Sequence, residues 1–347
     1  MPVPFKIEIF DRSFAFKAFS PIAQPAISYD YLTLEPTEIN CRGISAEKGD
    51  FAVISSPSGS AYQGIVDDVQ LESGATRLSI RPLLSLFDLD VHFDRNQSHQ
   101  LESFLAGIIT ANFGSNADAL QNIAGLTVTT TSTTVGYLNL KDNVHNLYEI
   151  IVKCLTAYGI VVSIALAPQT HTAQVVIGKA TTSATIEADL KGVLDKSFTL
   201  GDSYGAPNKL VCINAADETQ ALTYYLHTDG AIDTDGSSNR ITPVFASAEL
   251  VDVDDGDTFA AASYAAAYDA LKPDEYNDLI EITAPNDSRI IDVTMPIGTA
   301  ATIYHDGTSY STILTGYTRR DEITTLIFGC VRIDLTKKLI LERRRSK

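Results

Sequence analysis

The chain has 347 residues, 45% of them hydrophobic and 20% charged, with a formal net charge of −17. This length is too great for one ordinary core and predicts about two to three globular domains. The negative charge excludes ordinary nucleic-acid binding, which needs a basic surface to release counterions from the phosphates.

No apolar stretch reaches the roughly 18 residues that a membrane helix needs. The opening residues, MPVPFKIEIFDRSF, lack the apolar core and cleavage site of a signal peptide, so we expect neither a membrane segment nor export by the general secretory route. Cys41, Cys154, Cys212 and Cys330 are far apart and form no CxxC pair. That spacing favours reduced, buried thiols over disulfides or a zinc site.

The first hundred residues are rich in short strand signals separated by Gly, Pro and Ser. Strands are predicted at residues 6–10, 29–34, 51–55, 62–70 and 76–82. Short strands joined by such turns are typical of a compact barrel or sandwich.

Helical periodicity follows, with Ser98 as a candidate N-cap and Gly114 at the end of the pattern. A second amphipathic helix is predicted from Asp142 or Asn143 to Gly159. Strands are predicted around these helices at residues 126–134, 160–167 and 173–178. This order predicts an α+β module in which helices pack on a short antiparallel sheet.

Strand signals return at residues 197–200, 209–214 and 221–227, and an Ala-rich helix is predicted at about 258–271, where Pro273 stops it. The predicted fold class is therefore mainly β with an α+β insertion, a helix-on-antiparallel-sheet module placed within a β framework.

Three further β-rich runs lie at residues 301–305, 310–318 and 323–335. Asp306 and Gly307, between the first two runs, suit a tight hairpin turn with positive φ. These signals predict a closing β unit.

The last of these runs is apolar on both faces, and Leu326, Phe328 and Cys330 lie on one of them. A strand that is apolar on both faces must be covered on both. A barrel interior covers one face, so another domain or another subunit is expected to cover the other. Leu326, Phe328 and Cys330 are therefore candidate subunit-interface residues.

Residues 336–347 carry six basic residues against Glu342 alone, a charge of +5 that leaves −22 for the rest of the chain. A basic segment on an acidic body favours electrostatic docking onto an acidic neighbour. A frayed, solvated end is the alternative interpretation.

Two acidic stretches offer metal ligands. In DLDVHFD, Asp88, Asp90, His92 and Asp94 alternate with apolar residues, so a strand would present all four on one face. Residues two apart on a strand are separated by about 7 Å, so four of them do not reach one ion without a bend. A strand with one solvated face explains the pattern more simply.

In DVDDGDT, the carboxylates of Asp252, Asp254 and Asp257 are weak candidates for calcium. Gly256 comes one position too early for an EF-hand, and no Glu closes the loop. An acidic turn with Asp257 near a helix N-terminus explains the stretch, because the helix dipole favours negative charge there. We therefore predict no bound metal.

The sequence contains no GxSxG, HExxH, phosphate-loop or GxGxxG motif in the required context. The distribution of acidic residues singles out no carboxylate pair for glycosidase chemistry. We therefore predict no catalytic residue, no cofactor and no enzymatic activity.

Residues 62–93 read YQGIVDDVQLESGATRLSIRPLLSLFDLDVHF and are followed by NLYEIIVKCLTAYGIVVSI. Near the end stands TILTGYTRRDEITTLIFGCVRIDLTKKL. Together these stretches resemble the baseplate hub or tail-associated proteins of bacteriophage tails. The shared motifs mark strand and turn positions and carry no chemistry.

The resemblance implies two β-barrel domains per subunit that form a hub, and three subunits in a ring. It implies a first barrel at residues 1–95 plus 195–228, with an α+β domain at residues 96–194 inserted into it. The second barrel would occupy residues 229–347, with the helix at about 258–271 and the basic tail.

On this resemblance we expect a structural component of a phage or prophage tail tip, made in the host bacterial cytoplasm. The homotrimer would continue the tail tube and let DNA pass without specific binding. Its partners would be distal tail, tail tube, tape measure or fibre proteins. The alternatives are a β-rich surface adhesin or binding protein stabilised by calcium and, third, an unrecognised hydrolase.

Overall fold

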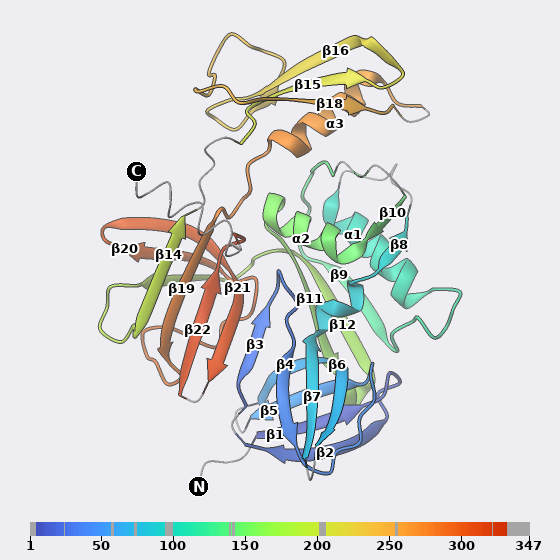
Figure 1. The fold of residues 1–347 in the computed structure, drawn as a ribbon, viewed down its shortest axis with the longest axis vertical. Helices are drawn as coiled ribbons and strands as arrows, with labels where there is room; N and C mark the ends of the chain where they lie inside the picture. Colours follow the sequence, from blue (N-terminus) through green and yellow to red (C-terminus); the bar gives the residue numbers. More distant parts are fainter. Residues whose placement is uncertain are drawn as a thin grey trace.

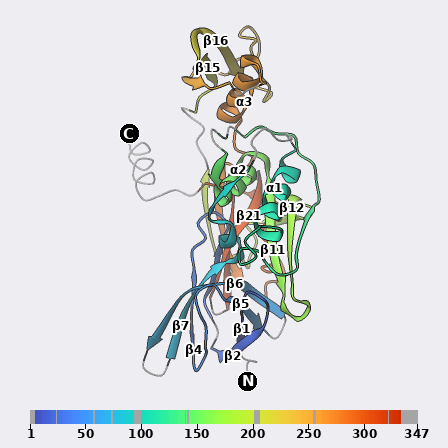
Figure 2. The ribbon, with the colours of Figure 1, turned by 90° about the vertical axis from the view of Figure 1, so that its right-hand side faces the viewer.

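The computed structural model describes residues 5–23, 25–56, 59–72, 75–93, 100–138, 140, 143–200, 206–253, 256–320 and 322–331. They form two curled β-sheets, an α+β unit and a separate small sheet with one helix (Figure 1). The first sheet lies at one end of the molecule and the small sheet at the other. The second sheet and the α+β unit lie side by side between them (Figures 1 and 2).

The first sheet has six strands in the order β2-β1-β5-β6-β7-β4. They are β1 (Phe5–Phe10), β2 (Phe16–Ile22), β4 (Thr37–Cys41), β5 (Phe51–Ser56), β6 (Gly59–Glu72) and β7 (Ala75–Pro82). The end strands β2 and β4 meet where the Ser20 hydroxyl donates to the Arg42 carbonyl (3.1 Å) and accepts from the Arg42 amide (3.4 Å). The sheet therefore curls into a barrel around buried residues such as Ile7 and Ile54.

The α+β unit follows the first sheet. Its elements are the 3₁₀ helix η1 (Leu83–Phe87), β8 (Asp90–His92), α1 (Leu101–Ile109), the π-helical turn η2 (Thr110–Gly114), β9 (Leu126–Thr130), β10 (Val144–Asn146), α2 (Leu147–Tyr158), β11 (Ile160–Ala167), the 3₁₀ turn η3 (Pro168–Thr170) and β12 (Thr172–Lys179). β11 and β12 pair antiparallel as expected, but β9 pairs parallel to β12, so this sheet is mixed.

Helix α2 begins at Leu147, later than predicted, and it ends at Tyr158, just before Gly159 as predicted. The Asn146 side chain, and not Asp142 or Asn143, caps it by accepting a hydrogen bond from the Glu149 amide (3.2 Å). Gly159 ends it in the left-handed conformation, with φ of 67°, which a residue without Cβ adopts at little cost.

The second sheet has the order β13-β20-β21-β22-β19-β14, and β3 pairs with β21 beside this path. Its strands are β3 (Ile27–Asp30), β13 (Ser183–Glu187), β14 (Asp195–Leu200), β19 (Asp278–Pro285), β20 (Ala300–His305), β21 (Thr308–Arg320) and β22 (Ile323–Phe328). The hairpin predicted at Asp306 and Gly307 is confirmed, with φ of 48° and 76°.

The small sheet at the far end, here called the distal module, has the order β17-β16-β15-β18. Its elements are β15 (Lys209–Asn214), β16 (Asp217–Leu226), β17 (Ile232–Asp233), β18 (Ala246–Val251) and α3 (Phe259–Leu271). Helix α3 packs on one face of the sheet, against Leu210, Cys212 and Tyr224. No helix in the described part of the chain is long and apolar enough to cross a membrane.

The predicted fold class, mainly β with two curled sheets and a helix-on-sheet module, is confirmed. The strand pairing differs from the expected division of the chain. β14 pairs with β19 in the second sheet, and β15 and β16 belong to the distal module, so residues 195–228 add no strand to the first barrel. The distal module, helix α3 included, is inserted between β14 and β19 of the second sheet.

Strand β3 joins the two sheets. It lies between β2 and β4 in the sequence, yet Ile27–Asp30 pairs with residues 316–319 of β21. The next residue, Tyr31, is 1% exposed. Its amide donates to the Thr315 carbonyl (2.9 Å) and its hydroxyl accepts from the Val162 amide (3.0 Å), while its carbonyl accepts from the Tyr148 hydroxyl (2.6 Å). The Tyr31 side chain and its peptide groups therefore link the second sheet to the α+β unit.

Because β3 lies so close to β21, a methyl group added at Gly316 should lower the stability of the fold. A Cβ at Gly316 would lie 2.8 Å from the Tyr29 carbonyl oxygen, a backbone atom that moves only if the two strands separate. We expect Gly316→Ala to lower the free energy of unfolding by about 1–3 kcal/mol, the usual result of overpacking. Denaturant unfolding measures this change.

Gly107→Ala on α1 is the control, because a Cβ there meets nothing within 4 Å. It should leave stability unchanged or raise it, since Ala favours a helix over Gly. Equal unfolding midpoints for Gly316→Ala and the unsubstituted chain would contradict the close contact of the two strands.

Candidate functional site

The predicted interface residues lie inside the chain's own core or against it. Leu326 and Phe328 are 0% exposed and pack with Ile280 and Leu314 in the interior of the second sheet. Cys330 is half-buried against the core of the α+β unit, and its amide donates to the Tyr276 carbonyl (3.1 Å). The curled sheet covers the face that carries Leu326 and Phe328, so these two side chains are not available to a second subunit.

Exposed apolar side chains gather instead at one end of the second sheet. Leu194, Ile290 and Ile323 are 58%, 42% and 41% exposed. The Leu194 amide donates a hydrogen bond to the Thr283 carbonyl near the end of β19. Ile323 pairs with Pro285 at the end of the same strand. Ile290 lies over Gly192, just before Leu194. We call these three residues the apolar rim.

The DLDVHFD stretch forms the half-solvated strand that the sequence favoured. Asp88, Asp90 and His92 are exposed, whereas Val91 and Phe93 are buried. Asp88 accepts a hydrogen bond from the Asn146 side chain (3.0 Å). Asp94 lies outside the described residues.

The second acidic stretch precedes α3, as predicted. Asp252 and Asp257 are exposed, and Asp254 lies outside the described residues. Thr258 caps the helix by accepting from the Ala261 amide (3.2 Å). Asp257 therefore stands one residue before the cap, close to the positive end of the helix dipole.

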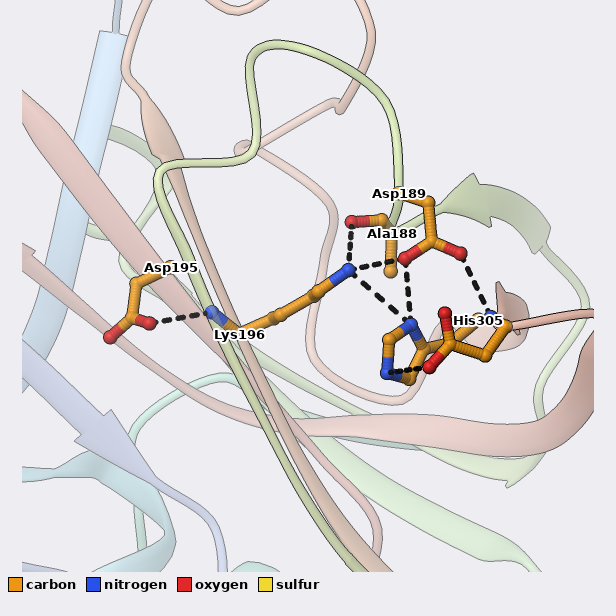
Figure 3. Close-up of polar contacts among 6 residues, drawn as sticks. Ala188, Asp189, Asp195, Lys196 and His305 are labelled. Carbon is orange, nitrogen blue, oxygen red and sulfur yellow. Dashed lines mark hydrogen bonds and ion pairs between the residues drawn. The ribbon is translucent and has the colours of Figure 1, made fainter.

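A cluster that the sequence did not indicate lies close to the apolar rim, on β14 and the turns beside it. It contains Asp189 from the turn after β13, Lys196 from β14, His305 at the end of β20 and Asp306 in the hairpin turn (Figure 3). The parallel pairing of β13 with β20 places Glu187 opposite Tyr304, so the residues that follow both strands converge.

Asp189 is the centre of this cluster. Its carboxylate forms an ion pair with the Lys196 ammonium, contacts His305 Nδ1 (2.7 Å) and accepts from the Asp306 amide (2.8 Å) (Figure 3). Because a carboxylate only accepts, the imidazole donates through Nδ1. The hydrogen bonds from these three donors lower the pKa of Asp189 below its usual range, and the bond from Lys196 has the largest effect.

The His305 ring is held in place from a second side. It stacks on Phe198 of β14, with ring centroids 4.4 Å apart and planes 20° from parallel. Its Nε2 lies 3.5 Å from the Asp306 carboxylate. Packing therefore joins β14 to the β20–β21 hairpin, and the charges of Asp189 and Lys196 join the turn after β13 to both.

Among the described residues, Asp189, His305 and Asp306 place three metal-ligand atoms within 4.8 Å of one another. His and carboxylate are ligands that zinc accepts. However, the Lys196 ammonium already neutralises Asp189 and also contacts the Ala188 carbonyl (3.2 Å). A metal ion would have to displace this lysine, so the geometry favours an ion-pair latch between two turns over a metal centre.

Sequence patterns had no means of finding this latch. Asp189 and His305 are 116 residues apart and share no motif. Only the pairing of β13 with β20, which the sequence did not indicate, brings them together.

The two curled sheets and the α+β unit form a fold that the chain shares with phage and prophage tail proteins of known structure. Among solved structures, the chain is similar to the 43 kDa tail protein of prophage MuSo2 from Shewanella oneidensis, at 13% identity and a TM-score of 0.56 over 94% of this chain and 98% of that one. It is also similar to the tail protein from Neisseria meningitidis MC58, at 11% identity and a TM-score of 0.52 over 94% and 96% of the two chains.

A third similar structure is a topological model of the p2 virion baseplate in its activated conformation, at 12% identity and a TM-score of 0.50 over 95% of this chain and 100% of that one. A scan of protein-family models and a search of curated proteins find no match. At these identities the likeness establishes the fold, and at that level the resemblance inferred from the sequence is confirmed.

The latch predicts a pH-dependent contribution to stability. Because the pKa of Asp189 is lowered in the folded state, its carboxylate stabilises the fold above the unfolded-state pKa, about 3.9, and this contribution is lost as the pH falls toward the folded-state pKa. We expect Asp189→Asn to lower Tm at pH 7, and the difference from the unsubstituted chain to shrink below about pH 4.

Asp195→Asn is the matched control, since the Asp195 carboxylate accepts from the adjacent Lys196 amide (2.9 Å) outside the latch. Thermal unfolding from pH 3 to 8 makes the comparison. A Tm difference for Asp189→Asn that stays constant across this range would contradict the latch.

Proposed function

We propose that the chain is a structural subunit of a bacteriophage or prophage tail tip, the baseplate hub, where three copies form a ring that continues the tail tube. The observation that carries this proposal is the shared fold. It extends over 94% of this chain and 98% of the prophage MuSo2 tail protein, so it is not confined to one common domain.

The subunit would act by shape and charge and not by chemistry. In the latch, a cluster of four titratable groups, the central carboxylate of Asp189 is neutralised by the lysine of the same cluster. A ring around a passing genome must repel DNA phosphates and must not bind them, and the charge of −17 suits such a wall. The proposed ring lets DNA pass without specific binding.

The apolar rim is the surface we assign to the contact between subunits. It replaces Leu326 and Phe328, which the fold buries. Leu194, Ile290 and Ile323 come from three segments of one sheet end, and exposed apolar side chains that gather in this way favour association. Tail tube, distal tail, tape measure or fibre proteins would meet the ring on its other surfaces, at the tip of a virion tail assembled in the host cytoplasm.

Mass in solution tests the ring. Light scattering coupled to size-exclusion chromatography at two concentrations should give a particle of three times the chain mass of 37.5 kDa, or a monomer that becomes this trimer as concentration rises. A stable dimer or tetramer would contradict the threefold ring.

Two variants test whether the apolar rim, and not any other exposed apolar side chain, forms the contact between subunits. Leu194→Asp combined with Ile323→Asp should shift the equilibrium toward monomer, because each places a charge in an apolar contact. Leu120→Asp, at a side chain that is 86% exposed in the α+β unit, should leave the mass unchanged. Trimers that survive the double substitution would place the interface elsewhere.

A further inference from the structure

The distal module has one covered face and one uncovered face. α3 covers the face that carries Leu210, Cys212 and Tyr224. Figure 1 shows that the helix lies between the sheet and the rest of the molecule, so the other face, here called the outer face, points away from the body.

The outer face is apolar along its centre. In the register of the sheet, Ile213 lies between Ala221 and Leu250, and the next row places Val211 between Thr223 and Ala248. Neighbouring strands are about 4.8 Å apart, so these side chains form one continuous surface. Leu250 is 56% exposed, and Ile213 and Val211 are partly exposed.

Acidic residues flank this apolar surface. β15 and β18 run parallel, so the residues that follow both strands come to the same end, where Asp217, Glu218 and Asp252 are exposed. From β15 through α3 the sequence has eleven acidic and two basic residues, a charge of −9 out of −17 for the chain.

The two basic residues lie at the opposite end of the outer face. Lys209 and Arg240 lie over the Tyr225 ring, 5.8 Å and 4.0 Å from its centroid. They leave the end near Asp217 without a basic partner of the module's own. A binding partner for the outer face would therefore combine aliphatic side chains with positive charge.

One segment of this chain has that composition. Residues 337–345 read KKLILERRR, in which three aliphatic residues stand between two lysines and three arginines. The segment 336–347 carries +5. Its sequence therefore matches the outer face in both respects, an apolar centre and a charge of opposite sign.

Val331, the last described residue before this segment, lies near the base of the distal module. The Val331 amide donates to the Asp278 carbonyl (3.0 Å), and Asp278 pairs with Leu200 of β14, nine residues before β15 begins at Lys209. Lys209 therefore lies at most about 30 Å from Leu200, and an extended chain from Val331 covers about 28–35 Å by residues 339–341. This reach is comparable with the distance to the Lys209 end of the distal module.

We propose that residues 337–345 dock on the outer face of the distal module of the same chain. The aliphatic residues 339–341 cover Ile213 and Leu250, and the arginines that follow lie near Asp217, Glu218 and Asp252. Attachment close to the site raises the local concentration of the segment well above that of a neighbouring copy's segment. This docking is independent of the proposed ring.

Photocrosslinking in the full-length chain tests the proposal. Ile340 is replaced by p-benzoylphenylalanine, the protein is irradiated, and crosslinked peptides are identified by mass spectrometry. We expect crosslinks to the peptides that contain Ile213 or Leu250, in the band of a single chain on a denaturing gel.

Three other outcomes would overturn the proposal. Crosslinks to the same peptides in a band of two or more chains would assign the outer face to a neighbouring copy's segment. Crosslinks to other surfaces, or none, would remove the outer face as the docking site.

Substitutions on each side of the contact sharpen the test. Leu250→Asp, and separately Arg343→Glu combined with Arg344→Glu and Arg345→Glu, should abolish most of the product, and raised salt should weaken it because the charge term is screened. Leu71→Asp, at a side chain 82% exposed in the first sheet, is the control and should leave the yield unchanged. Unchanged yields in the first two variants would contradict the docking.

Discussion

The pairing of β3 with β21 is the constraint on which the rest of the structure depends. The chain leaves the first sheet after β2, adds β3 to a sheet that is otherwise built from residues 183–328, and returns to the first sheet at β4, so the two curled sheets are joined and are not independent domains. Gly316 permits the close approach, and Tyr31 extends it by bonding to both the second sheet and the α+β unit. The ring proposed for this chain needs a subunit whose sheets keep one arrangement, and the β3–β21 pairing is a contact that holds them.

The same arrangement separates the surfaces by role. The rigid centre holds the two sheets and the α+β unit, while the apolar rim lies at one end of the second sheet. The distal module is inserted between β14 and β19 and carries much of the acidic charge away from that centre. The Asp189–His305 latch joins the turn after β13 to the β20–β21 hairpin, close to the apolar rim.

Local signals predicted many of the elements but missed β2, β4, β13, β18 and β19, and no local signal predicted the long-range pairing. β11 and β15 have the predicted bounds, and Gly159 ends α2 because the positive φ there is a local property. The β3–β21 pair and the parallel β9–β12 pair join distant segments that no local pattern connects. The sequence predicts Leu326 and Phe328 at an interface because apolar residues on both faces of a strand indicate that both faces are covered. The pattern does not show whether the covering residues belong to the same chain. The latch required β13 beside β20, and so had no signal at all.

The central claim is that this fold works as a threefold ring. Single-particle electron cryo-microscopy of the purified protein tests it most directly, because a map shows symmetry, opening and contact surface together. The account predicts three copies around a central opening wide enough for duplex DNA, with Leu194 and Ile323 at the contacts between them. A twofold particle, or a ring with the apolar rim facing solvent, would contradict it.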